Sequence, residues 1–222
     1  MTTRARPAPA ARTGRAREPA QATPAPVHYD VRAASLHGHR FAVQITIDRP
    51  AAVQRVSLPA WIPGSYLIRE FARHLQPLQA TQGRTACACV QIDKASWDIE
   101  CDPRRPLVLR YEVYAFDNSV RTAWLDAERG FFNGTSLCLQ VLGQAHQPHE
   151  LTVVSTRATK GWRVATGLPP VDADARGFGR YRAADYDSLV DHPFELGTFW
   201  SGEFTACGVS HRFVVAGALP SF

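Results

Sequence analysis

The stretch Phe41-Ala-Val-Gln-Ile-Thr-Ile47 places a large apolar residue at every second position, with small or polar residues between them. Side chains of a β-strand point alternately to its two faces, so this pattern predicts a half-buried strand. Residues 27–31 alternate in the same way, and residues 35–39 are expected to form the turn between the two strands. The fold is therefore expected to begin with an antiparallel hairpin.

Seven further segments have the short, alternating or β-branched pattern of strands. They are residues 53–58, 85–92, 96–100, 107–116, 137–142, 151–156 and 209–216. No window longer than about ten residues has the 3.6-residue period of an amphipathic helix, so only short helical turns are expected, at 65–73 and at 185–190. The predicted fold class is all-β, an antiparallel β-sandwich or a curved two-sheet domain.

The formal net charge of +5 is concentrated in the first 26 residues. Five arginines and one glutamate there contribute +4, which leaves +1 for residues 27–222. Proteins that bind nucleic acids draw most of their affinity from positive side chains that neutralise phosphates. Residues 27–222 are nearly neutral and lack this excess of positive charge. We therefore expect no nucleic-acid partner.

Residues 1–26 are rich in alanine, proline and arginine, and they are predicted to form a disordered extension. They lack the apolar core of a secretory signal, and their prolines would interrupt the amphipathic helix of an organelle transit peptide. The sequence has no apolar run near the ~18 residues of a transmembrane helix. These patterns favour a cytoplasmic protein without a membrane partner.

The cysteines are odd in number and the chain has no export signal, so reduced thiols are expected. They are Cys87, Cys89, Cys101, Cys138 and Cys207. Cys87 and Cys89 lie two residues apart, so on a strand they share one face and could approach Cys101. A Cys-x-Cys pair without a second pair at zinc-finger spacing favours packing side chains over a metal site.

The most site-like stretch is Pro59-Ala-Trp-Ile-Pro-Gly-Ser-Tyr-Leu-Ile-Arg-Glu-Phe-Ala-Arg-His74, whose prolines and glycine fix an irregular backbone that presents aromatic and charged side chains together. Two more distinctive segments follow it. They are Tyr114-Ala-Phe-Asp-Asn-Ser-Val-Arg-Thr-Ala-Trp-Leu-Asp126, continued by Arg129-Gly-Phe-Phe-Asn-Gly-Thr-Ser136, and Tyr186-Asp-Ser-Leu-Val-Asp-His-Pro-Phe-Glu-Leu-Gly197. In this order the segments resemble the N-terminal part of the glycyl aminopeptidase family, metallopeptidase family sixty-one, which is related to the thermolysin-like and leukotriene-hydrolase-like enzymes.

The resemblance implies an N-terminal β-domain, a helical catalytic domain that binds zinc, and usually a C-terminal peptide-binding domain. It also implies that a zinc-activated water hydrolyses the peptide bond after the N-terminal residue of a substrate. The preferred N-terminal residues in the family are glycine and alanine. On this basis residues 27–180 are expected to be the β-domain. Residues 181–222 are expected to be a linker and a stub, the first strands of a catalytic domain truncated before the zinc motif.

The zinc motif of that family, His-Glu-x-x-His on a helix, is absent from the sequence. The nearest match is His146-Gln-Pro-His-Glu150, and Pro148 excludes the helix, so turn or strand-start residues are expected there. We therefore assign no catalytic residue, metal ligand or cofactor to this chain. The resemblance implies zinc only for the full-length members of the family. We predict that this chain alone has no peptidase activity. Isolated histidines such as His28 and His74 are expected to be structural or exposed.

The resemblance further implies that the first two segments face the catalytic domain and line the peptide cleft. The candidate substrate-binding residues are Tyr66, Arg69, Asp117, Arg121 and Asn133.

The alternative gives the same segments a structural role, in which aromatic side chains pack in the core and an arginine pairs with an acid. It involves Trp61, Phe71, Phe131 and Phe132 in the core, and an ion pair of Arg69 or Arg121 with Asp117 or Asp126.

The expected partners are peptide N-termini, if a catalytic domain is supplied, and a second copy of the chain through exposed C-terminal strands. A different class of function stays open: a stand-alone β-sandwich module that binds a protein or a peptide. A degenerate product without function is the third alternative.

Overall fold

The computed structural model describes residues 26–62 and 65–217, and every statement below concerns these residues. The predicted disordered extension lies outside them, apart from its last residue, Pro26.

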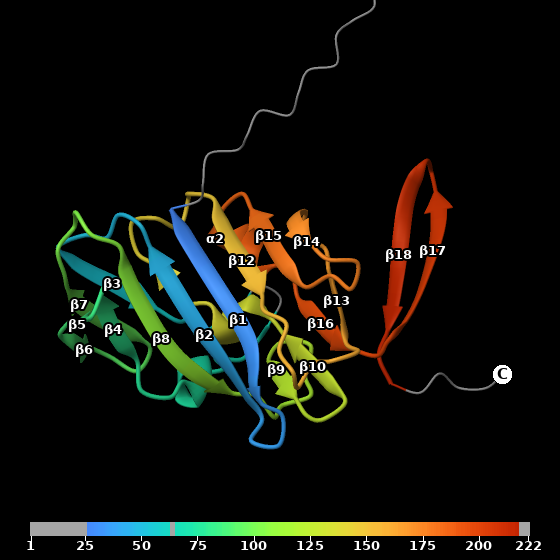
Figure 1. Cartoon of the computed structure of the whole chain (residues 1–222), viewed down its shortest axis with the longest axis horizontal. Coiled ribbons are helices and arrows are strands. Elements are labelled where there is room, and N and C mark those ends of the chain that lie inside the picture. The colour runs from blue at the N-terminus through green and yellow to red at the C-terminus, as the bar shows by residue number, and fades with distance from the viewer. Residues whose placement is uncertain (1–25, 63–64, 218–222) are drawn as a thin grey trace, which may run out of the picture.

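The largest sheet has eight strands in the order β14-β15-β12-β1-β2-β8-β4-β5 (Figure 1). Its strands are β1 (Val27–Ser35), β2 (Arg40–Ile47), β4 (Gln79–Gln82), β5 (Thr85–Ala86), β8 (Leu107–Tyr114), β12 (His149–Val153), β14 (Pro170–Ala173) and β15 (Gly179–Ala183). β1 and β2 form the predicted antiparallel hairpin, whereas β12 runs parallel to β1. The predicted all-β fold class is confirmed.

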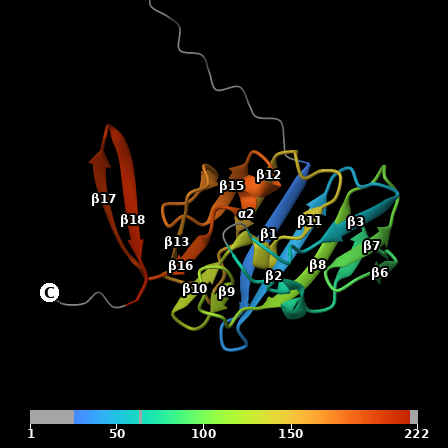
Figure 2. The ribbon, with the colours of Figure 1, turned by 180° about the vertical axis from the view of Figure 1, so that it is seen from behind.

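Two four-stranded sheets complete the body (Figure 2). The first, in the order β11-β3-β7-β6, contains β3 (Val53–Ser57), β6 (Cys89–Gln91), β7 (Ser96–Glu100) and β11 (Gln140–Val141). The second, in the order β13-β16-β10-β9, contains β9 (Ala123–Leu125), β10 (Arg129–Phe132), β13 (Arg163–Thr166) and β16 (Phe194–Gly197).

One hydrophobic core joins the three sheets, because the inward side chains of each belong to the same buried cluster. The ring of Phe41 on β2 lies 5.4 Å from that of Phe132 on β10, and Phe132 stacks on Phe194 of β16 at 4.9 Å. Val56 and Ile99 bring the other small sheet into the cluster without any exposed surface. The alternation that predicts the first strands thus corresponds to a sheet with one buried face.

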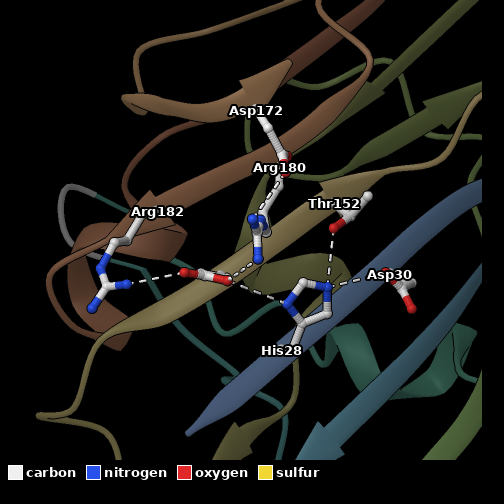
Figure 3. A network of polar contacts seen from close by, with 7 residues as sticks. His28, Asp30, Thr152, Asp172, Arg180 and Arg182 are labelled. Atoms are coloured by element: carbon white, nitrogen blue, oxygen red, sulfur yellow. Dashed lines mark hydrogen bonds and ion pairs between the residues drawn. The ribbon is translucent and has the colours of Figure 1, made fainter. Parts of the chain in front are cut away.

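The other face of the large sheet carries polar side chains that pair across neighbouring strands (Figure 3). Glu150 on β12 is the centre of one group, and only 7% of its side chain is exposed. It accepts from Arg182 at 3.0 Å and from Arg180 at 3.3 Å, and His28 lies 3.7 Å away. A carboxylate that is this buried is tolerated because both of its oxygens have cationic partners.

Helices are short, as the lack of helical periodicity predicts. They are the 3₁₀ turn η1 (Phe71–His74), α1 (Gly134–Leu137) and α2 (Tyr186–Val190). Asp185 caps α2 by accepting from the Ser188 amide at 2.7 Å, as expected for this position. No helix in the described part of the chain has the length and apolarity that a bilayer crossing requires.

Two predicted strands differ from the structure. Residues 85–92 divide into β5 and β6, which belong to different sheets, because the chain passes from one sheet to the other at Cys87 and Ala88. Residues 137–142 contain only the two-residue strand β11, because tyrosine hydroxyls bind the backbone carbonyls that a longer strand would pair.

The last two strands, β17 (Trp200–Ala206) and β18 (Val209–Val215), form a separate hairpin that projects from the body (Figure 1). The predicted boundary between residues 180 and 181 coincides with no break in the sheets. β16 lies after this boundary and pairs with β10 and β13 from before it, and the chain leaves their sheet at Gly197.

Candidate functional site

The loop between β3 and η1 is held by the buried Ser65, which is only 6% exposed. Its carbonyl accepts from the indole of Trp61 at 2.6 Å, and its hydroxyl accepts from Nε of Arg69 at 3.4 Å. The Arg69 amide also donates to the carbonyl of Ala60 at 2.8 Å, which closes the base of the loop. These bonds fix the base of the loop on both sides of residues 66–68, which form its tip.

Those tip residues are large and apolar, yet they are exposed. Tyr66 is fully exposed, and Leu67 and Ile68 keep 63% and 74% of their surface. A cluster of exposed apolar side chains on a protein surface commonly marks an interaction site.

A second loop, residues 117–122, follows β8 and is closed by the hydroxyl of Thr122. This hydroxyl donates to the carbonyls of Asp117 at 2.8 Å and of Ser119 at 3.1 Å. The Asp117 amide donates to the carbonyl of Ala123, so both ends of the loop are fixed. The loop presents the Asp117 side chain and Val120, which is 72% exposed.

Three tyrosines fix the end of α1 and the two residues that follow it. The hydroxyls of Tyr111, Tyr186 and Tyr29 donate to three successive carbonyls, those of residues 137, 138 and 139, at 2.5, 2.7 and 2.8 Å. Carbonyls at a helix C-terminus have no partner within the helix, so these bonds satisfy groups that would otherwise be buried and unpaired.

At its N-terminus, α1 is capped by Asn133, whose side chain accepts from the amide of Thr135 at 3.2 Å and from its hydroxyl at 2.8 Å. The next residue, Gly134, packs so closely on α2 that an added Cβ would lie 2.9 Å from Cα of Val190. Both helices are therefore held in place against the body.

The two loops meet at a pair of adjoining cavities of about 270 and 170 Å³. Five residues line both cavities: Phe71, Arg73, His74, Asp117 and Thr122. Segments recognised separately in the sequence therefore form one site.

Charged groups of both signs are available at this site. Nε of Arg73 donates to Nε2 of His74 at 3.0 Å, which requires a neutral imidazole. Burial lowers the pKa of His74, and the nearby Arg73 charge lowers it further. Within the described chain, the Asp117 carboxylate has no hydrogen-bond or ion-pair partner, so it can accept a cationic ligand.

Ser136 lines the larger cavity from α1 and is only 4% exposed. Its hydroxyl has no hydrogen-bond partner among the described residues. A buried hydroxyl normally has one, so Ser136 is available to a ligand in the cavity.

A strip of aromatic side chains leads away from the larger cavity. The rings of Tyr114 and Phe116 lie 6.5 Å apart, and Phe116 stacks on Trp124 at 4.4 Å. His39 supports the strip from the β1–β2 turn, with its ring 3.9 Å from Phe116 and its Nδ1 donating to the carbonyl of Leu125. Flat, half-exposed rings of this kind suit contact with an extended chain.

The structure brings together two of the five predicted substrate-binding residues. Asp117 lines both cavities, and Arg69 lines the smaller one. Tyr66 lies beside them in the same loop but is fully exposed, while Asn133 acts as the helix cap. Arg121 does not line either cavity, and its amide donates to the hydroxyl of Ser119.

The expected ion pair of Arg69 or Arg121 with Asp117 or Asp126 is wrong for the described residues. Asp126 instead closes its own turn by accepting from the amides of Glu128 and Arg129, at 2.8 and 2.7 Å. Arg129 forms the brace, with two bonds to Glu195 and one to Asn118, the neighbour of Asp117.

The structural alternative is right for part of the aromatic set. Phe71 and Phe132 are buried, but 52% of Trp61 is exposed and Phe131 is half-buried.

Sequence reasoning missed Ser136 and expected His74 to be structural or exposed. It indicated that Arg73 could pair with a carboxylate but did not place it among the candidate site residues. Nothing in the spacing of these residues signals that residues 73–74 and residue 136 reach one cavity. The contact depends on how the sheets pack.

No group of three or more His, Cys, Asp or Glu side chains is placed to hold a metal ion in residues 26–62 and 65–217. His149, part of the look-alike zinc motif, starts strand β12 as expected, and its Nδ1 donates to the carbonyl of Gln147 at 2.7 Å.

The chain is similar to known proteins in sequence and in fold. The model of the Peptidase M61 N-terminal domain matches residues 28–198. The crystal structure of an aminopeptidase N family protein from Idiomarina loihiensis is 42% identical, with a TM-score of 0.84 over 86% of this chain and 32% of that one. The present chain thus spans about a third of the length of this relative.

A more distant likeness concerns the fold alone. An M1 zinc metallopeptidase from Deinococcus radiodurans, solved with a Tyr-Ser-Ala substrate, has a TM-score of 0.51 and 12% identity, over 88% of this chain and 48% of that one. No curated protein sequence matches the chain. The family match covers most of the chain, including both loops and α1, and the chain therefore belongs to the Peptidase M61 N-terminal domain family.

Proposed function

We propose that this chain forms the N-terminal wall of the peptide cleft in a zinc aminopeptidase, and that the surface around the two cavities faces the peptide and the zinc-binding region. The main support is the Asp117 carboxylate, which has no hydrogen-bond or ion-pair partner among the described residues and lies at a cavity rimmed by the exposed side chains of Leu67 and Ile68. An exposed apolar rim is expected where another polypeptide covers the surface.

Asp117 is suited to recognise the ammonium group of a peptide N-terminus, because an unpaired carboxylate attracts a cation and accepts its hydrogen bonds. The larger cavity measures about 270 Å³, slightly below the ~300–1,000 Å³ of sites for drug-sized ligands. A small N-terminal residue such as glycine or alanine suits that space. Arg69 and Tyr66 would contact the peptide from the rim, and Asn133 and Arg121 would hold the wall in shape.

Peptide hydrolysis would need zinc and its ligands from outside this sequence, which contains no His-Glu-x-x-His. We therefore expect the purified chain not to hydrolyse glycyl or alanyl anilides when zinc is added. Turnover that a chelator abolishes would contradict this expectation.

Peptide titrations followed by NMR test the role of Asp117. An alanyl peptide with a free N-terminus should shift the amide signals of Thr122, Ala123 and Ser136, and its N-acetylated form should bind several-fold more weakly. Asp117→Asn should remove this difference. Asp48→Asn is the matched control, because Asp48 follows the end of β2 that pairs with Leu107, opposite the end near the cavity.

Equal binding of both peptide forms to the unaltered chain would contradict ammonium recognition by Asp117. Tight binding of an internal peptide, independent of its N-terminus, would support the stand-alone peptide-binding module instead.

A further inference from the structure

Two cysteines meet at the point where the chain passes from the large sheet to the sheet of β3, β6, β7 and β11. The Cys87 amide donates to the carbonyl of Ala80 at 2.9 Å, which continues the pairing of β4 with β5. Two residues later, Cys89 pairs with Ile99 in the β6–β7 ladder. Cys87 therefore lies at the boundary of both sheets.

The register of the second ladder places Cys87 opposite Cys101. After the pair Cys89 and Ile99, the amide of Glu100 donates to the carbonyl of Ala88 at 3.1 Å, which extends the antiparallel pairing by one residue. The next pair in this register is Cys87 and Cys101. On its other side, the Cys101 amide donates to the carbonyl of Ala52 at 3.0 Å, so its backbone is held in an extended path.

The two thiols point to the same face of the ladder. Alternate residues of a strand share a face, so Cys101 lies on the side of Ile99, which is fully buried, and Cys87 lies on the side of Cys89. Both cysteines are half-buried and pack against the core. Burial raises the pKa of the Cys101 thiol, and the neighbouring Cys87 raises it further.

This geometry meets the requirements of a disulfide. Residues directly opposite in an antiparallel pair have Cα atoms about 4.5 or 5.5 Å apart. Disulfides join Cα atoms about 4.4–6.8 Å apart. The strands already have the spacing that a disulfide needs. Both thiols are free in the structure, and Sγ of Cys101 donates to the carbonyl of Ala51 at 3.1 Å, so the Cys101 side chain has to give up this bond when the disulfide forms.

We propose that Cys87 and Cys101 are an oxidation site, which a peroxide or a small-molecule disulfide converts into an intramolecular disulfide. With hydrogen peroxide, one thiolate attacks an oxygen atom and becomes a sulfenic acid, with release of one water. The second thiol attacks that sulfur, the S–S bond forms and a second water leaves, so two thiols and one peroxide give one disulfide and two waters. With a small-molecule disulfide, two exchanges give the same bond and two small thiols.

The disulfide would tie the end of β7 to the crossover between the two sheets. It closes the loop of residues 87–101, and a cross-link of this loop length is expected to raise Tm by about 5–10 °C in a protein of this size. Because burial raises the pKa of Cys101, its thiolate is scarce at neutral pH, and oxidation is expected to be slow.

Peptide mapping of the full-length chain tests the proposal directly. A Cys207→Ser background prevents links between molecules through the exposed Cys207. After oxidation, trypsin should release peptides 85–94 and 95–104 as one linked species, two hydrogen masses lighter than the separate peptides and separated by dithiothreitol. Tm should rise on oxidation and fall back on reduction.

Single variants identify the partner within peptide 85–94, which carries two cysteines. Cys87→Ser and Cys101→Ser should abolish both the linked species and the change in Tm. Cys89→Ser is the matched control and should retain both, because Cys89 lies opposite Ile99.

Three results would overturn the proposal: a link within peptide 85–94, a cross-link that survives in Cys87→Ser, or no link in the folded chain under conditions that oxidise Cys207 in the unaltered protein. The peptide map of the Cys207→Ser chain decides the matter even if a further serine variant fails to fold.

Discussion

His149 is a residue whose burial should affect stability as the pH changes. It is fully buried between Tyr29 and Tyr186, and its Nε2 has no partner in the described chain. Burial lowers the pKa of His149, because a charged imidazole would lose its hydration there. The folded chain therefore holds His149 neutral, while the unfolded chain titrates near pH ~6.5.

The sign of the effect follows from these two states. Below pH ~6.5 the unfolded chain binds a proton that the folded chain does not, so stability is full above this pH and falls as the pH drops toward the lowered folded pKa. The slope from one such group cannot exceed ~1.4 kcal/mol per pH unit. Urea unfolding between pH 7.5 and 5 should show a shallower loss for His149→Gln than for the unaltered chain.

The control for this prediction is His37→Gln, since His37 is exposed in the β1–β2 turn. This variant should keep the slope of the unaltered chain. Identical slopes in all three proteins would show that His149 does not carry the pH dependence.

At the scale of elements, the segment of α1 depends on hydroxyl groups from distant strands. Tyr111→Phe removes the donor to the carbonyl of Leu137 and the acceptor of the Leu139 amide. Leaving buried backbone groups unpaired costs about 1–3 kcal/mol, so we expect a loss of this size in the free energy of unfolding. Hydrogen exchange of the amides of residues 134–139 should also become faster.

Tyr66→Phe is the matched change, because the Tyr66 side chain is fully exposed. It should alter the free energy of unfolding by less than about 0.5 kcal/mol. Two outcomes would show that the hydrogen bonds of the Tyr111 hydroxyl do not hold α1. They are an equal loss of stability in both variants and unchanged exchange at residues 134–139 in Tyr111→Phe.

The same element shows which parts of the fold the sequence can predict. Apolar and polar residues alternate over residues 41–47 because one face of their strand is buried. The sequence pattern alone therefore predicts this strand. Residues 137–139 have an equally apolar pattern, but their carbonyls are taken by hydroxyls from residues 29, 111 and 186. No local sequence pattern indicates such partners. Of the strand expected over residues 137–142, only β11 at residues 140–141 forms.

For the whole molecule, the same limit applies to the candidate site. The irregular backbone and exposed aromatic residues of the loop at 59–74 are local features and mark it as a site. The meeting of His74, Asp117 and Ser136 is not local, because it depends on where β8 and α1 place their ends. The sequence can therefore indicate which segments matter, and the packing of the sheets decides which side chains face one another.

At the scale of the whole molecule, the β17–β18 hairpin presents an exposed apolar face. Its register puts Trp200, Phe204, His211 and Phe213 on one face, where Phe204 stacks on His211 at 4.9 Å. Trp200, Phe204 and Phe213 remain 47–57% exposed, and no other strand in the described part of the chain pairs with the outer edges of β17 and β18. An apolar face with open edges favours pairing with another chain.

We therefore expect the purified 222-residue chain to self-associate through this hairpin, with an average mass in sedimentation velocity that rises with concentration. Phe204→Ser combined with Phe213→Ser should lower the association several-fold, because it removes the exposed rings and leaves the strand hydrogen bonds. Glu203→Gln with Arg212→Gln, a cross-strand pair on the opposite face, is the matched control and should associate as the unaltered chain does. A monomer at every concentration, or equal association of the two double variants, would show that the apolar face is not the contact.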